Sequence, residues 1–144
     1  MFINRVKRAL AEGRTQIGTG YGQIRTPEAV RILAAAGFDW IFIDTEHGVF
    51  HQETIQDLCR AATDNNMVPI VRVASLEYDL VARALDCGGQ GVIFPRVESV
   101  ELLQEAVSWT KFPPVGVRGF GLTPSYVNYE KATIPQILEH VNRE

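Results

Sequence analysis

The chain has 144 residues, of which 46% are hydrophobic and 22% are charged, a composition typical of one globular domain. Its net charge of −3 gives no bulk attraction for nucleic acid, which we therefore exclude as a partner. No segment is apolar over the length that a membrane span needs, so no membrane partner is expected. The two cysteines, Cys59 and Cys87, lie in apolar helix-like patterns without metal-type spacing, which favours a reducing, cytoplasmic setting.

The predicted elements begin with a strand at Gln16–Tyr21. A helix then starts at Thr26 and Pro27, because threonine can cap free amides and proline fits the first helical position. Gly37 ends this helix. The next strand is Trp40–Ile43, a continuous apolar run of the kind that is buried on both sides in a parallel sheet.

The same alternation continues along the rest of the chain. Further strands are predicted at Val68–Val73 and Gly91–Pro95, although Pro69 argues mildly against the first because proline lacks a ladder donor. Helical spacing of apolar residues predicts helices within Ile55–Ala62, Leu80–Leu85, Val100–Val107 and Ile134–Val141, and the prolines and glycines of Lys111–Tyr129 predict a long loop. About four strand-then-helix units indicate an α/β fold, either an open doubly wound sheet or a (β/α) barrel.

Ionisable residues collect at the carboxyl ends of these strands. Asp44 ends the second strand, Glu46 and His47 open its loop, Arg72 lies near the end of the third strand, and Arg96 lies just past the fourth. The carboxyl ends of parallel strands share one edge, which holds the active site in barrels and open α/β sheets alike. The sequence therefore predicts an acid–base cluster at this edge.

Each of these residues also has a structural interpretation. Asp44 can cap its own loop, whereas His47, beside two carboxylates that can orient its ring, is the better acid–base candidate. Arg72 requires an anionic partner inside an apolar run, which is either Asp44, Asp86 or a bound carboxylate. Direct metal chelation by Asp44, Glu46 and His47 is geometrically unfavourable, because three ligands within four residues rarely reach one ion.

A family resemblance rests on four stretches, which read AAAGFDWIFIDTEHGVF, VPIVRV, ALDCGGQGVIFPRVES and FPPVGVRGFG. In this order they resemble the class II pyruvate aldolases of the HpcH/HpaI family, which include 4-hydroxy-2-oxoheptanedioate aldolase and 2-dehydro-3-deoxyglucarate aldolase. The resemblance implies a (β/α)8 TIM barrel of the phosphoenolpyruvate/pyruvate superfamily. Such a barrel needs about 250 residues. Residues 1–144 are thus expected to form a single incomplete barrel domain with about the first four βα units.

The resemblance also implies an activity and residue roles. The protein would be a carbon–carbon lyase that reversibly cleaves a 4-hydroxy-2-oxo acid to pyruvate and an aldehyde on a divalent metal (Mg, Mn or Co). His47 would be the acid–base residue, directly or through metal-bound water, and Asp44 would orient it. Arg72 would bind the ketone oxygen and stabilise the enolate. Glu46 would act behind them through metal-bound water, and Asp86 matches a position near a neighbouring subunit's site, so a homo-oligomer is expected.

The metal site is where the chain departs from the family pattern. The family's two metal-binding carboxylates follow later strands, so we predict that this chain has no metal ligand and no aldolase activity by itself. Two other hypotheses compete with this one. In the first, the chain is a self-associating half-barrel that binds a small carboxylate without catalysis. In the second, it is a citrate-lyase-like acyl-CoA lyase relative.

Overall fold

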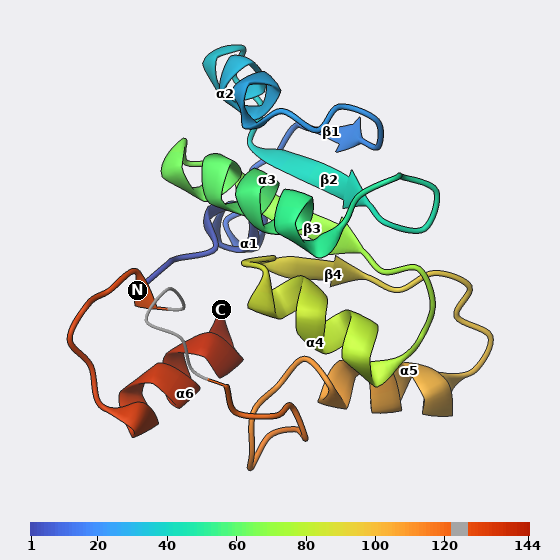
Figure 1. The fold of residues 1–144 in the computed structure, drawn as a ribbon. Helices are drawn as coiled ribbons and strands as arrows, with labels where there is room; N and C mark the ends of the chain where they lie inside the picture. Colours follow the sequence, from blue (N-terminus) through green and yellow to red (C-terminus); the bar gives the residue numbers. More distant parts are fainter. Residues whose placement is uncertain (122–126) are drawn as a thin grey trace.

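The computed structural model describes residues 1–121 and 127–144 and shows an α/β fold (Figure 1). Four parallel strands lie in the order β1-β2-β3-β4. They are β1 (Gly18–Tyr21), β2 (Trp40–Asp44), β3 (Val68–Arg72) and β4 (Gly91–Ile93). A helix follows each strand, namely α2 (Pro27–Ala35), α3 (Gln52–Asp64), α4 (Tyr78–Asp86) and α5 (Val100–Ser108), while α1 (Arg5–Ala11) precedes β1 and α6 (Ile134–Arg143) comes last. The predicted alternation and the four βα units are confirmed.

The start and end of α2 follow from local chemistry. The Thr26 hydroxyl accepts a hydrogen bond from the Glu28 amide at 3.3 Å, and Pro27 occupies the first helical position. Gly37, at φ 91°, adopts the left-handed conformation that ends many helices. The sequence prediction for this helix is therefore confirmed in its mechanism as well as its position.

The two faces of β2 differ in burial. Ile41 and Ile43 are fully buried in the core, where α3 packs on β2 and β3. Phe42 and Asp44 point to the opposite face and are only half-buried. The prediction of burial on both sides is thus wrong for β2, because among the described residues no helix layer covers the second face as completely as α3 covers the first. Asp44 and Arg72 share that less buried face.

Pro69 lies inside β3 without breaking the sheet. A strand residue directs its N–H and C=O to the same neighbour, and the Pro69 carbonyl accepts from the Gln90 amide at 2.9 Å. The side of Pro69 that lacks an N–H therefore faces the residues just before β4. The pairing of β3 with β4 starts only at Ile70 and Gly91, so no ladder bond is lost. β4 itself is shorter than the predicted Gly91–Pro95, although the Ile93 carbonyl still accepts from the Val73 amide at 3.2 Å.

Both chain ends lie on one side of the molecule (Figure 1), where the Asn4 amide donates to Glu144 Oε2 at 3.0 Å. The last predicted helix is confirmed as α6. The predicted loop Lys111–Tyr129 includes residues 122–126, which lie outside the described residues; its described part contains no α-helix or strand. Within the described ranges, none of the helices has the length and apolarity needed to cross a bilayer.

Candidate active site

Asp44 and Arg72 form the centre of a polar cluster at the carboxyl ends of the strands. They are direct neighbours in the register of β2 and β3. Arg72 donates from Nε to Asp44 Oδ1 at 3.1 Å and from Nη2 to Asp44 Oδ2 at 2.8 Å, a bidentate pair. These bonds hold the pKa of Asp44 below its usual range, against the opposing effect of burial, and raise the pKa of Arg72. Of the partners that the sequence left open, Arg72 takes Asp44.

Asp44 also organises the loop that follows it. Its Oδ1 accepts from the backbone amides of Glu46 at 3.0 Å and His47 at 3.2 Å, so the loop-capping interpretation is also correct. Gly48 closes the turn, because a Cβ there would lie 2.0 Å from the Asp44 carbonyl oxygen. The sequence Asp-Thr-Glu-His-Gly thus folds tightly around one carboxylate, and only glycine fits its last position.

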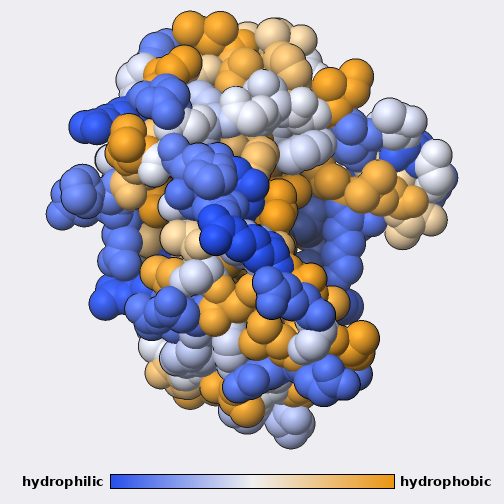
Figure 2. All heavy atoms as spheres, turned by 90° about the vertical axis from the view of Figure 1, so that its right-hand side faces the viewer, coloured by the Kyte–Doolittle hydropathy of each residue, from blue (hydrophilic) through white to orange (hydrophobic). Residues whose placement is uncertain are grey.

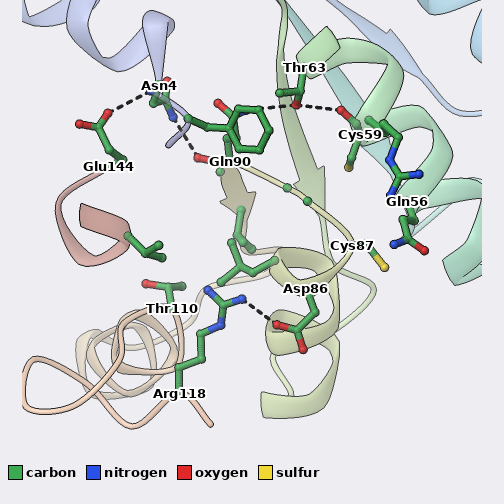
Figure 3. Close-up of a pocket in the computed structure, with 18 of the residues that line it drawn as sticks. Asn4, Gln56, Cys59, Thr63, Asp86, Cys87, Gln90, Thr110, Arg118 and Glu144 are labelled. Carbon is green, nitrogen blue, oxygen red and sulfur yellow. Dashed lines mark hydrogen bonds and ion pairs between the residues drawn. The ribbon is translucent and has the colours of Figure 1, made fainter. Parts of the chain in front are cut away.

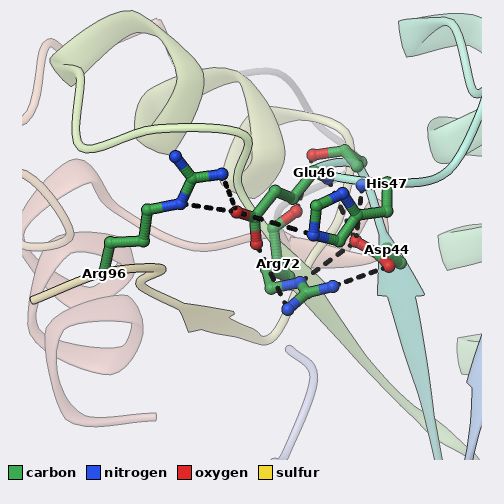
Figure 4. A network of polar contacts seen from close by, with 6 residues as sticks. Asp44, Glu46, His47, Arg72 and Arg96 are labelled. Atoms are coloured by element: carbon green, nitrogen blue, oxygen red, sulfur yellow. Dashed lines mark hydrogen bonds and ion pairs between the residues drawn. The ribbon is translucent and has the colours of Figure 1, made fainter.

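Glu46 lies between two arginines and is the most buried carboxylate of the cluster (Figure 4), with its side chain 7% exposed. Arg72 Nη1 lies 3.2 Å from its Oε2, and Arg96 donates from Nε and Nη2 to its Oε1 at 3.1 and 2.9 Å. Arg96 follows β4 and Glu46 follows β2, so this contact joins two loops across the end of β3. Arg96 was expected near the cluster because it lies just past a strand, but no role was predicted for it.

His47 is far more accessible than Glu46, its neighbour in the loop after β2. Its side chain is 67% exposed, and its Nε2 lies 3.8 Å from Glu46 Oε1, too far for a hydrogen bond. The Asp44 carboxylate accepts from the backbone amide of His47 and from Arg72, and no hydrogen bond joins it to the His47 ring. The expectation that Asp44 orients the imidazole ring therefore takes a different form, since Asp44 positions the residue through its backbone.

The cluster opens onto one face of the molecule. Figure 2 views the side toward which the strands point in Figure 1, and hydrophilic residues cross the middle of that face between hydrophobic regions. Arg72 stacks on the Phe42 ring, with its guanidinium carbon 5.1 Å from the ring centroid. An apolar surface thus supports the guanidinium from the less buried face of the sheet.

Asp86 does not join the cluster within this chain. It ends α4 and pairs with Arg118, whose Nη2 lies 2.7 Å from Asp86 Oδ1 (Figure 3). Both residues line a cavity of about 570 Å³ near the start of β4, a set of residues that includes none of Asp44, His47 and Arg72. The cavity therefore does not mark the acid–base chemistry. The assignment of Asp86 to a neighbouring subunit's site stays a prediction.

The described residues do not fit a divalent metal by themselves. Residues 1–121 and 127–144 contain no group of three or more His, Cys, Asp or Glu side chains placed to hold an ion. Both carboxylates of the cluster already contact guanidinium groups.

Comparisons with known proteins show which family this chain resembles. A family model described as HpcH/HpaI aldolase/citrate lyase matches residues 21–140. A pyruvate aldolase from Rhizobium etli is 35% identical over 99% of this chain and 59% of its own length. A 5-keto-4-deoxy-D-glucarate aldolase from Enterobacter sp. strain 638 is 32% identical over 96% of this chain and 57% of its own length.

Solved structures show the same likeness in three dimensions. The HpcH/HpaI aldolase from Desulfitobacterium hafniense DCB-2 superposes with a TM-score of 0.90 at 30% identity, covering 96% of this chain and 53% of that one. The citrate synthase SbnG gives a TM-score of 0.80 at 29% identity, covering 99% of this chain and 53% of that one. The chain thus spans 57–59% of the length of the two curated relatives, the Rhizobium etli and Enterobacter aldolases.

Proposed function

The chain belongs to the HpcH/HpaI aldolase/citrate lyase family, and from this premise we propose that its strand-end cluster is part of the active site of an aldol lyase. The proposed reaction is the reversible cleavage of a 4-hydroxy-2-oxo acid into pyruvate and an aldehyde. The observation that carries the proposal is the position of Arg72. Its guanidinium is fixed between two carboxylates at the carboxyl end of β3.

Arg72 is suited to stabilise an enolate. A guanidinium has five N–H groups; those of Arg72 Nε and Nη2 donate to Asp44, and Nη1 lies 3.2 Å from Glu46 Oε2 in an ion pair. The other N–H groups on Nη1 and Nη2 can donate to an oxygen that becomes negatively charged during the reaction. Because the two carboxylates fix the plane of the group beforehand, little reorganisation is needed when that charge develops.

The proposal assigns the proton transfer to His47. In the cleavage direction a base removes the proton of the C4 hydroxyl, the C3–C4 bond breaks, and its electron pair forms the enolate of pyruvate while the aldehyde leaves. C3 of the enolate then takes a proton to give pyruvate. His47 Nε2 makes no hydrogen bond to Glu46 and lies on an exposed side chain, so it is free to accept the hydroxyl proton.

The family resemblance implies a divalent metal that would bind the 2-oxo acid. The described residues do not supply a ligand group for it, so no step of the reaction is assigned to a metal here. Metal dependence, the nature of the aldehyde and the oligomeric state stay predictions.

The experiment is an aldol-cleavage assay of the whole protein, with released pyruvate measured by coupled NADH oxidation. We expect His47→Ala to lower kcat by roughly 100- to 10,000-fold, because it removes the general base. His51→Ala, an exposed histidine just before α3, is the control and should retain wild-type turnover. Equal activity of the two variants would show that the strand-end cluster is structural.

A further inference from the structure

Arg96 makes a contact for which neither the fold nor the proposed chemistry accounts. It reaches from the loop after β4 to Glu46 in the loop after β2 (Figure 4). Its own side chain is 74% exposed, whereas that of Glu46 is 7% exposed. Ion pairs with so exposed a partner contribute little stability. Stability therefore does not explain the contact.

The backbone of Arg96 is in an unusual conformation. Its φ is 49°, in the left-handed region that favours glycine over residues with a Cβ. Such strained residues persist where the surrounding structure needs them, and they gather at functional sites. The chain thus holds a strained arginine at the position from which its guanidinium reaches the cluster.

One oxygen of Glu46 is the point at which this contact matters. Oε1 receives two hydrogen bonds from Arg96, at 3.1 and 2.9 Å, while His47 Nε2 lies 3.8 Å from the same oxygen. Arg96 thus places two donors on this oxygen, whereas His47 Nε2 makes no hydrogen bond to it. The other oxygen of Glu46, Oε2, lies 3.2 Å from Arg72 Nη1.

We propose that Arg96 is a positioning residue, which holds Glu46 against Arg72 and keeps His47 Nε2 free for substrate. It contacts no reacting atom and acts only through Glu46. The inference deepens the proposed aldol-lyase function and rests on it. Without Arg96, Glu46 Oε1 is released from the guanidinium and can turn toward His47 Nε2, 3.8 Å away, and the two would form a direct hydrogen bond.

Three substitutions separate this role from a structural one. Arg96→Ala removes the guanidinium and keeps the strained backbone, whereas Arg96→Gly removes the guanidinium and relieves the strain. Arg96→Lys keeps a cation that can reach one carboxylate oxygen. Arg31→Ala on α2 is the control, because it removes an exposed ion pair with Glu28 far along the sequence from the cluster.

We expect Arg96→Ala and Arg96→Gly to lower kcat by roughly ten- to a hundredfold in aldol cleavage while KM changes little, because misplaced groups slow the chemical step. Arg96→Gly should unfold at the same or a higher denaturant concentration than wild type, so its loss of turnover cannot come from instability. Arg96→Lys should recover part of the rate. Turnover of the Gly and Ala variants within twofold of wild type would overturn the proposal.

A second measurement does not depend on aldolase activity. The chain has three histidines, so the ring signals of His47 can be assigned by NMR with a His47→Gln variant. Arg96→Ala should move the His47 ring signals, through the new contact with Glu46, and leave those of His51 and His140 in place. Unmoved His47 signals would contradict the positioning role, whereas moved signals in a protein without aldolase activity would refute the proposed function alone.

Discussion

Two arrangements in this molecule use the same three residue types and differ in burial. In each, an aspartate pairs with an arginine that also stacks on a phenylalanine: Asp44 with Arg72 on Phe42, and Asp86 with Arg118 on Phe112. The Arg118 side chain is 3% exposed and that of Asp86 is 48% exposed. The Arg72 side chain is 24% exposed and adjoins a second carboxylate.

The two aspartate–arginine pairs differ in where their arginines come from and in how far these are exposed. Arg118 comes from the loop after α5 and pairs with the end of α4, so its burial fastens an irregular segment to a helix. Arg72 comes from the carboxyl end of β3, where Asp44 fixes the plane of its guanidinium but part of the side chain remains accessible. The buried arginine joins two segments of the fold, whereas Arg72 is accessible enough to contact a ligand at the strand ends.

The largest expected effect comes from Arg72→Lys. Lysine keeps the charge but cannot reproduce the planar fork that binds Asp44 and a ketone oxygen together. We expect turnover in aldol cleavage to fall by roughly 100- to 1,000-fold, the scale for loss of one charge-stabilising donor, while the thermal midpoint stays near that of wild type. Turnover close to wild type would remove Arg72 from the mechanism and erase the functional side of the comparison.

Arg118→Met should act on stability. Methionine keeps apolar contact with Phe112 but loses the bond to Asp86. We therefore expect the free energy of unfolding, measured in urea, to fall by about 2 kcal/mol. Arg31→Met, which removes the exposed pair with Glu28, is the matched control and should cost about 0.5 kcal/mol or less. If both variants cost the same, burial does not distinguish the two kinds of arginine.

The smallest expected effect is a pH dependence of stability from Asp44. Because Arg72 lowers the pKa of Asp44 in the folded state, the stabilisation is present above the unfolded pKa of about 3.9 and is lost as pH falls through the lower folded value. The stability difference between wild type and Asp44→Asn should therefore shrink between about pH 5 and pH 2. Glu28→Gln, an exposed carboxylate variant, is the control. A difference that stays constant with pH would mean that Arg72 does not bias the protonation of Asp44.

Much of the fold could be predicted because its signals are local. The cap at Thr26, the glycine that ends α2 and the apolar spacing of α3 each depend on residues within a turn or two. The meeting of Asp44, Glu46 and Arg72 could also be predicted, since parallel strands bring their carboxyl ends to one edge.

Other features were decided only by the tertiary structure. The register of β2 on β3 places Asp44 beside Arg72 and so selects one of the partners that the sequence left open. The half-exposed face of β2, the burial of Arg118 and the reach of Arg96 to Glu46 likewise depend on segments far apart in the chain. Periodicity and capping report what a residue prefers within its own segment. Which acid pairs with which base is decided by distances between segments, and those exist only once the chain is folded.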